Sequence, residues 1–218
     1  HEIKNPLTPI ALSAERIGRQ LERLENIPPE SRRILRECTG TIGQSVESVK
    51  TLVDEFSQFA RFPAAQPQRG DLNEVVESAL EVFNGRLEDI EIQTCLEPGL
   101  PPVNIDREQF KRVVVNLVDN AAEAMQDALV KKLYIATHAP SPDLVELVIA
   151  DTGCGVTAEE KEKLFLPYFS TKGRGTGLGL AIVNHIVSDH GAQIRVEDNE
   201  PAGARFTVYR GVGALLER

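Results

Sequence analysis

The fold of this chain is decided most by Gly173-Arg174-Gly175-Thr176-Gly177-Leu178-Gly179-Leu180, in which glycines alternate with other residues and lead into an apolar helical pattern that ends at Asp189. The run matches neither the G-x-G-x-x-G dinucleotide motif nor the G-x-x-x-x-G-K-[ST] phosphate loop. Its N–H groups and the positive end of the following helix can still bind the phosphates of a nucleotide, with contacts added by Lys172, Arg174 and Thr176. A flexible linker is the alternative, which the apolar helix disfavours.

A second glycine segment, Asp151-Thr152-Gly153-Cys154-Gly155, follows an apolar strand pattern. At the end of that strand, the Asp151 carboxylate can accept a hydrogen bond from the exocyclic amine of adenine. Gly153 and Gly155 lack a Cβ atom, so the backbone can come close to a bound base. Taken alone, the segment also fits a plain Asp-Thr-Gly turn.

Two asparagines, Asn116 and Asn120, stand four residues apart on a predicted helix. Side chains at this spacing project from one helix face, where amide oxygens can complete the shell of a hydrated Mg²⁺ that bridges phosphates. Asparagine forms helices poorly, so a polar patch on an otherwise apolar helix is the alternative. Together with the glycine segments, the pair favours a magnesium-nucleotide site.

The chain opens with His1-Glu2-Ile3-Lys4-Asn5-Pro6. The imidazole of His1 is largely neutral and nucleophilic near pH 7, and the Glu2 carboxylate can orient the ring and accept a proton. Asn5 lies one helical turn further on and can orient a water molecule. An ordinary helix start with Pro6 in its first turn is the alternative for this segment alone. Together with the two glycine segments and the asparagine pair, this segment predicts the acceptor of a nucleotide-dependent phosphoryl transfer.

Composition excludes several other classes of function. The 218 residues carry a net charge of −9 and a pI of about 5.1, which disfavours nucleic acid as a partner. Cys38, Cys95 and Cys154 form no C-x-x-C pair, so reduced thiols are expected rather than disulfides or a zinc site. No apolar run approaches the roughly 18 residues of a membrane helix, so no membrane contact is expected. Because the first residue is His1 rather than Met, we expect a piece of a longer protein.

Residues 1–62 are predicted to form a helical hairpin. Apolar positions alternate at spacings of four and three along two segments, which Pro28-Pro29 separates. Because two helices cannot cover both seams, we expect a homodimer in which two hairpins form a four-helix bundle. Packing of both helices against the rest of the same chain is the alternative. The first seam comprises Ile3, Leu7, Ile10, Ala14, Ile17, Leu21 and Leu24, and the second comprises Leu35, Cys38, Ile42, Ser45, Val49, Leu52, Phe56 and Phe59.

Residues 63–70 are predicted to be a linker, because Pro, Gly and polar residues break every periodicity there. Residues 71–218 then form a second domain that mixes helix and strand patterns. Capping patterns begin helices at Asp71, Asp106 and Thr157. Strands are expected over 90–94, 133–137, 144–150, 193–197 and 204–209, with a turn over 139–143. We therefore expect an α+β chain with a mixed sheet that carries helices on one face.

Five segments in this order make the chain similar to the sensor histidine kinases of two-component systems. His1–Leu7 resembles the H box, Asn116–Asn120 the N box, Asp151–Gly155 the G1 box, Phe165–Phe169 the F box and Gly173–Leu180 the G2 box. Asn5–Ile10, with Ser13–Arg16, is further similar to the nitrogen-regulation sensors of the NtrY type.

The resemblance implies a dimerisation and histidine-phosphotransfer hairpin followed by an ATP-binding domain, a two-layer α/β sandwich of the Bergerat or GHKL fold. ATP is then expected to phosphorylate His1, and the phosphohistidine to pass the group to an aspartate of a response regulator. Glu2 and Asn5 are implied to serve phosphotransfer and dephosphorylation of the regulator. This region is implied to face the cytoplasm, in a parent protein that can be anchored in the inner membrane. In the family the first helix continues upstream, so we expect the first residues to fray and this chain to autophosphorylate poorly.

The resemblance also implies the roles of the nucleotide-binding residues. Asn120 is implied to be the principal Mg²⁺ ligand, with Asn116 assisting, and Asp151 to read adenine. Gyrase, Hsp90 and MutL ATPases are the nearest alternative, but they resemble one another in a glutamate at position 116, and an amide cannot accept the proton of an attacking water. An inactive scaffold that only dimerises and binds nucleotide is the other alternative, and it would not need His1 or Glu2.

Overall fold

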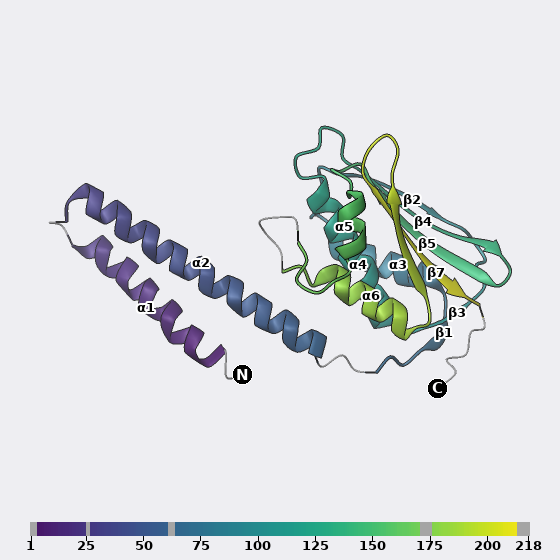
Figure 1. Cartoon of the computed structure of the whole chain (residues 1–218), viewed down its shortest axis with the longest axis horizontal. Coiled ribbons are helices and arrows are strands. Elements are labelled where there is room, and N and C mark those ends of the chain that lie inside the picture. Colours follow the sequence, from purple (N-terminus) through teal and green to yellow (C-terminus); the bar gives the residue numbers. More distant parts are fainter. Residues whose placement is uncertain (1–3, 25–26, 61–63, 171–175, 213–218) are drawn as a thin grey trace. The chain divides into compact units, whose positions relative to one another are not determined.

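A computed structural model describes residues 4–24, 27–60, 64–170 and 176–212. The chain divides into two compact units, His1–Phe62 and Pro63–Arg218, each described here by itself. The first unit is a pair of helices, and the second combines a five-stranded sheet with helices (Figure 1). Within the described ranges, every helix lacks the long apolar stretch that a membrane crossing requires.

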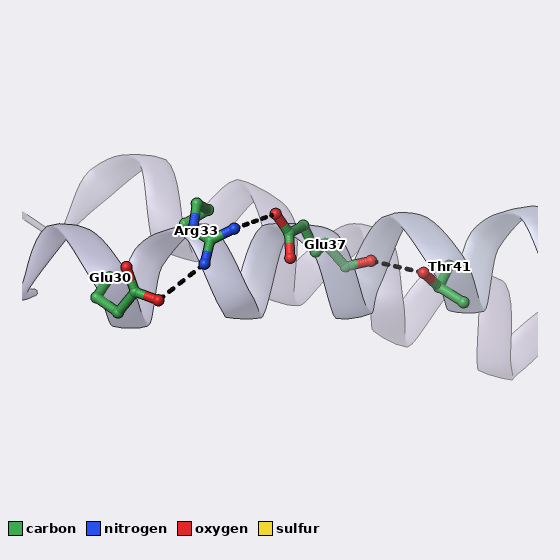
Figure 2. Close-up of polar contacts among 4 residues, drawn as sticks. All are labelled: Glu30, Arg33, Glu37 and Thr41. Atoms are coloured by element: carbon green, nitrogen blue, oxygen red, sulfur yellow. Dashed lines mark hydrogen bonds and ion pairs between the residues drawn. The ribbon is translucent and has the colours of Figure 1, made fainter.

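The first unit consists of α1 (Lys4–Arg23) and α2 (Pro29–Ala60). Pro29 is tolerated as the first residue of α2, because the first N–H groups of a helix have no partner within it. The guanidinium of Arg32 donates to the carbonyl of Leu24 and so ties the start of α2 to the end of α1. Figure 2 shows Arg33 between two carboxylates of its own helix, at 2.8 Å from Glu30 and 3.1 Å from Glu37. These exposed pairs each contribute only about 0.3–0.5 kcal/mol.

The predicted seam of α1 divides into an inner and an outer half. Ala14 and Leu21 are buried, with 4% and 6% of their surface exposed, whereas Ile17 and Leu24 are 47% and 50% exposed. Because the buried positions are seven residues apart, as are the exposed ones, each set forms its own line along the helix. Packing against α2 therefore uses half of the seam and leaves the other half open.

The predicted seam of α2 is not the face that packs on α1. Leu35, Ile42 and Val49 are 41%, 41% and 38% exposed, whereas Val46, which the seam omits, is 6% exposed. Thr39 likewise faces α1, where its hydroxyl is 4.0 Å from the Cβ position of Gly18. The helix carries apolar residues on two faces, and the spacing alone identified only the outer one.

The second unit confirms the predicted mixed sheet. The strand order is β2-β4-β5-β7-β6, with β2 parallel to β4 and every other neighbouring pair antiparallel. Helices α3, α4 and α6 lie on one face of this sheet (Figure 1). The strands are β2 (Glu91–Leu96), β4 (Lys132–Ser141), β5 (Leu144–Asp151), β6 (Gln193–Asp198) and β7 (Ala204–Gly211), and the helices are α3 (Leu72–Leu80), α4 (Arg107–Ala124), α5 (Ala158–Lys163) and α6 (Gly179–Asp189).

The core lies between α4 and the sheet. Alternate strand residues point toward the helices, so that Ile135, Ile149 and Phe206 form one row across neighbouring strands. Phe110 and Leu117 of α4 are each 1% exposed. Burying a side chain of this size contributes about 1.5–3 kcal/mol, so the apolar face of α4 is held firmly on the sheet.

Two of the predicted helix caps are confirmed and one is only partly right. Asp106 caps α4 by accepting from the Gln109 N–H at 3.2 Å, and Thr157 with Glu160 forms a complete capping box. Asp71 caps α3 by accepting from the N–H of Asn73. Glu74, at the third helical position after Asp71, does not close a capping box but forms an ion pair with Arg107 of α4.

Two further predictions need correction. The last residues of the predicted linker form β1 (Gln68–Gly70), which pairs with β3 (Val103–Ile105) in a two-stranded sheet. Strands this short carry too little alternation to be detected. In addition, β4 continues through Ser141 after a register shift, so the turn predicted over 139–143 shrinks to residues 142–143. Pro140 is tolerated there because a bulge removes the need for its N–H.

One buried histidine links two helices of the second unit. His190 at the end of α6 is fully buried, its Nε2 accepts from the N–H of Asp106 at 2.9 Å, and its Nδ1 lies 2.7 Å from the carbonyl of Ile186. The ring can make both bonds only while neutral, because Nε2 acts as an acceptor. Burial lowers the pKa of His190, with Arg210 adding to this effect, while the Ile186 carbonyl and the Asp106 and Asp189 carboxylates oppose it.

We therefore expect acid to destabilise the second unit through His190. Because the pKa of His190 is lowered in the folded state, only the unfolded chain binds a proton on this ring just below about pH 6.5. The free energy of unfolding should then fall with decreasing pH by up to about 1.4 kcal/mol per pH unit. Urea unfolding at pH 7.5 and 5.5 measures this, with His190→Gln as the control. An equal pH dependence in the wild type and the variant would contradict it.

Candidate functional site

One stripe of α4 carries the centre of the candidate site. Asn116, Asn120 and Ala124 are spaced by four residues, so they share a face of the helix over about 12 Å. Asn116 donates through Nδ2 to the carbonyl of Arg112 at 2.9 Å, which directs its Oδ1 away from the helix axis. The Nδ2 of Asn120 is buried and has no hydrogen-bond acceptor among the described atoms.

The first residue of α6 lies directly against these two amides. A Cβ atom on Gly179 would be 3.3 Å from Asn116 Oδ1 and 3.8 Å from Asn120 Nδ2. The N-cap residue Leu178 makes no side-chain cap bond, and its own N–H donates weakly to the Thr176 hydroxyl at 3.4 Å. The start of α6 thus offers N–H groups and a positive helix end beside two amides, an arrangement suited to an anion and its cation.

The Asp151 segment meets the other end of the same stripe. A Cβ atom on Gly153 would be only 2.5 Å from the carbonyl oxygen of Ala124, which also accepts from the N–H of Cys154 at 3.1 Å. No other residue type allows this approach, so Gly153 holds the segment against α4. Gly155 has a φ of +72°, in the left-handed region that glycine adopts readily.

The carboxylate of Asp151 is fixed by the backbone. Asp151 ends β5 and is 2% exposed. Its Oδ1 accepts from the N–H of Gly153 at 2.8 Å and from the N–H of Ala204 at 3.3 Å. Two bonds to one oxygen set the plane of the carboxylate, which can then present a defined acceptor to a ligand.

The glycine run is joined at its base to the segment that precedes it. The N–H of Tyr168 donates to the carbonyl of Gly177 at 3.0 Å. Gly177 has a φ of +68°, and a Cβ atom there would be 2.7 Å from the carbonyl of Phe169. Gly177 therefore cannot be replaced without moving this contact, which fixes where α6 begins.

Some predicted site residues cannot be placed. His1, Glu2, Lys172, Arg174 and Gly175 lie outside the described residues. Asn5 lies in α1, and its side chain is also outside the described part of the chain. Their roles remain predictions.

The structure brings the other predicted residues together and adds three that sequence reasoning missed. Gly153 and Gly179 lie against the face of α4 that carries Asn116 and Asn120, and Asp151 is bonded to the N–H of Gly153. The missed residues are Ala124, Asn199 and Gly203. Ala124 lies four residues beyond Asn120, and this continued spacing is a signal that could have identified it. Asn199 and Gly203 belong to an Asn-Glu-Pro-Ala-Gly turn whose contact with Asp151 is invisible to local patterns.

The described residues fit both a divalent cation and a phosphate group. Amide oxygens such as Asn116 Oδ1 are ligands of the kind that Mg²⁺ accepts. The unsatisfied amide of Asn120 needs a partner, since a buried donor without an acceptor costs about 1–3 kcal/mol. The missing side chain at Gly179 leaves room beside both amides.

Comparison with known proteins identifies relatives of both units. A family model described as "Histidine kinase-, DNA gyrase B-, and HSP90-like ATPase" matches residues 105–210. Nitrogen regulation protein NtrY of Azorhizobium caulinodans is 35% identical over 203 residues, which cover 91% of this chain and 26% of NtrY. The chain therefore spans about a quarter of the length of this relative.

Two solved structures extend the comparison. The catalytic domain of histidine kinase ThkA is 31% identical, with a TM-score of 0.59, and the match covers 67% of this chain and 95% of that domain. The structure of ThkA in complex with the response regulator protein TrrA is 26% identical, with a TM-score of 0.67, and the match covers 97% of this chain and 59% of the ThkA chain.

We expect Gly153→Ala to destabilise the second unit by about 2 kcal/mol, because the added methyl group overlaps the carbonyl of Ala124 and the backbone must shift. Gly70→Ala is the matched control, since its Cβ position is 3.9 Å from the nearest atom outside its neighbours, the Gln68 carbonyl. Urea unfolding of both variants measures the difference. Equal stabilities would show that the segment does not press on α4 as described.

Proposed function

The chain belongs to the sensor histidine kinases, and from this premise we propose that it is the catalytic core of such a kinase and uses ATP to phosphorylate itself on His1. The observation that carries the proposal is the stripe of α4, which meets both the Asp151 segment and the start of α6. In this proposal α4 sets the distance between the Asp151 carboxylate, which binds the base, and the start of α6, which binds the phosphates. Such spacing suits a nucleotide.

In this proposal the residues of the second unit hold Mg-ATP. Asp151 accepts from the exocyclic amine of adenine, and Gly153 and Gly155 let the base approach the backbone. The N–H groups at the start of α6, with Thr176 and Lys172, bind phosphate oxygens. Asn120 and Asn116 supply amide oxygens to Mg²⁺. Mg²⁺ held by these amides would neutralise part of the triphosphate charge during phosphoryl transfer.

The acceptor in this proposal is the imidazole of His1. Its neutral ring nitrogen attacks the γ-phosphorus, the bond to the bridging oxygen breaks, and ADP leaves. Glu2 accepts the proton that the ring loses. The phosphoryl group then passes to an aspartate of a response regulator, which the ThkA complex with its regulator supports as the partner class. Asn5 orients water for dephosphorylation of the regulator.

The two alternatives are less well supported. An ATPase of the gyrase or Hsp90 kind needs a base for water, whereas position 116 holds an amide whose Nδ2 is bound to the Arg112 carbonyl. A scaffold that only dimerises and binds nucleotide has no use for His1 or Glu2, the proposed acceptor and its base.

We also propose that the first unit dimerises through its open apolar seam. Ile17 of α1, Leu24 just after α1, and Leu35 and Ile42 of α2 remain 41% to 50% exposed when the two helices pack together. A second hairpin of the same sequence carries the same seam, so two copies can cover each other in a four-helix bundle.

Incubation with γ-³²P-labelled ATP tests the phosphorylation. We expect acid-labile, base-stable label on the wild type, a loss of about a hundredfold or more in His1→Gln, and no label when EDTA removes Mg²⁺. His138→Gln is the matched control, because His138 pairs with Glu146 on the second unit and serves no proposed step. Wild-type labelling of His1→Gln would refute the acceptor. Transfer from the labelled chain to candidate regulators then identifies the partner.

Sedimentation equilibrium tests the dimer. Ile17→Glu places a charge in the proposed interface, so we expect the dimer to weaken about a hundredfold or more. Gln44→Glu introduces the same charge at an exposed polar position of α2 and should leave the dimer intact. A wild-type chain that is monomeric at high concentration, or equal effects of the two variants, would contradict the proposal.

A further inference from the structure

Asp151 is held by a turn that no motif of the sequence marks. The turn over residues 199–203 joins β6 to β7 and lies at the end of the sheet where β5 finishes (Figure 1). The side-chain Nδ2 of Asn199 donates to the main-chain carbonyl of Asp151 at 2.8 Å. The N–H of Asn199 itself donates to the carbonyl of Gly203 at 3.0 Å, which closes the turn.

The bond from Asn199 lies where the ladder between β5 and β7 ends. The register between β5 and β7 ends at the pair Ala150 and Arg205, while on the other side Asp151 pairs with Leu133 of β4. The next amide of β7, the N–H of Ala204, donates to the Asp151 side chain instead of its carbonyl. The amide of Asn199 therefore anchors the main chain of Asp151 at the point where the ladder ends.

Gly203 lets the turn lie directly against the main chain of Asp151. It has a φ of +106°, and a Cβ atom there would lie 1.9 Å from the carbonyl oxygen of Asp151. The same residue lies against the other glycine segment, because a Cβ atom on Gly155 would be 3.3 Å from the Gly203 carbonyl. The turn thus contacts Asp151 and Gly155 together and fixes their relative position.

We propose that Asn199 is a positioning residue for adenine recognition, whose amide holds Asp151 in the orientation that binds the exocyclic amine of the base. This inference rests on the proposed ATP-binding function. Asn199 acts through Asp151 and does not touch the nucleotide in this account. Loss of its bond frees the last residue of β5 and lets the carboxylate turn away from the amine.

The inference predicts a selective loss that depends on the 6-amino group. Calorimetric titration with Mg²⁺ compares ADP with purine riboside diphosphate, which lacks that amine. We expect the wild type to bind ADP more tightly. Asn199→Asp keeps the shape of the side chain but turns an oxygen toward the Asp151 carbonyl, so ADP affinity should fall about tenfold. Affinity for purine riboside diphosphate should change by less than about twofold.

Two further variants separate positioning from general damage to the turn. Asn199→Ala removes the donor without adding charge, and it should show the same selective loss if Asn199→Asp does not fold. Asp198→Asn is the matched control. It breaks the ion pair of 2.7 Å between Asp198 and Lys161 of α5 in the same part of the chain, and neither partner bonds to Asp151. It should bind both nucleotides as the wild type does.

Each outcome decides the inference. Unchanged preference for ADP in the folded Asn199 variants would overturn it, and so would an equal loss for both nucleotides, which indicates a purely structural role. A wild type that does not distinguish the two nucleotides would overturn it as well. A wild type that binds neither nucleotide would instead refute the proposed ATP-binding function.

Discussion

The packing of α4 is the constraint on which the second unit depends. One face of the helix, which includes Phe110 and Leu117, is buried against the sheet and cannot shift without opening the core. The stripe of Asn116, Asn120 and Ala124 is consequently fixed in space as well. Two glycine segments far apart in the sequence, one at Gly153 and one at Gly179, lie against this stripe, and at Gly153 the approach is closer than any side chain would allow. The site is therefore assembled by backbone contact with a single helix.

The residues around the ends of α4 lower the stability of the second unit in favour of ligand binding. An apolar residue at position 120 would suit a helix packed in this place better than an amide whose buried Nδ2 has no acceptor among the described atoms. Gly153, Gly177 and Gly203 also lower stability, because a glycine loses more conformational entropy on folding than a larger residue does. The apolar core between α4 and the sheet tolerates these losses. A chain selected only for folding would have little reason to keep polar and strained positions around the ends of α4.

The sequence predicted what depends on neighbouring residues. Asp106 and Thr157 were identified as helix caps because each bonds a backbone N–H three residues away, and the spacing of Asn116 and Asn120 placed both on one helix face. Contacts between distant segments were missed. β1 and β3 are three residues each and pair only through the tertiary fold. Val46 was overlooked because α2 has apolar residues on two faces. His1 and Glu2 lie outside the described residues, so their predicted roles rest on the sequence motif alone.

The contact between Asn199 and Asp151 also bears on how the molecule forms. Its two residues are separated by 48 positions, whereas β4 and β5 are joined by a short turn. Closing a long loop costs more chain entropy than closing a short one, so the hairpin of β4 and β5 can form early. The hydrogen bond from Asn199 to Asp151 forms only when β7 docks. Competence to bind the base is then acquired among the last steps of folding. A nascent chain that has not yet added β7 would have most of its sheet and still be unable to select its nucleotide.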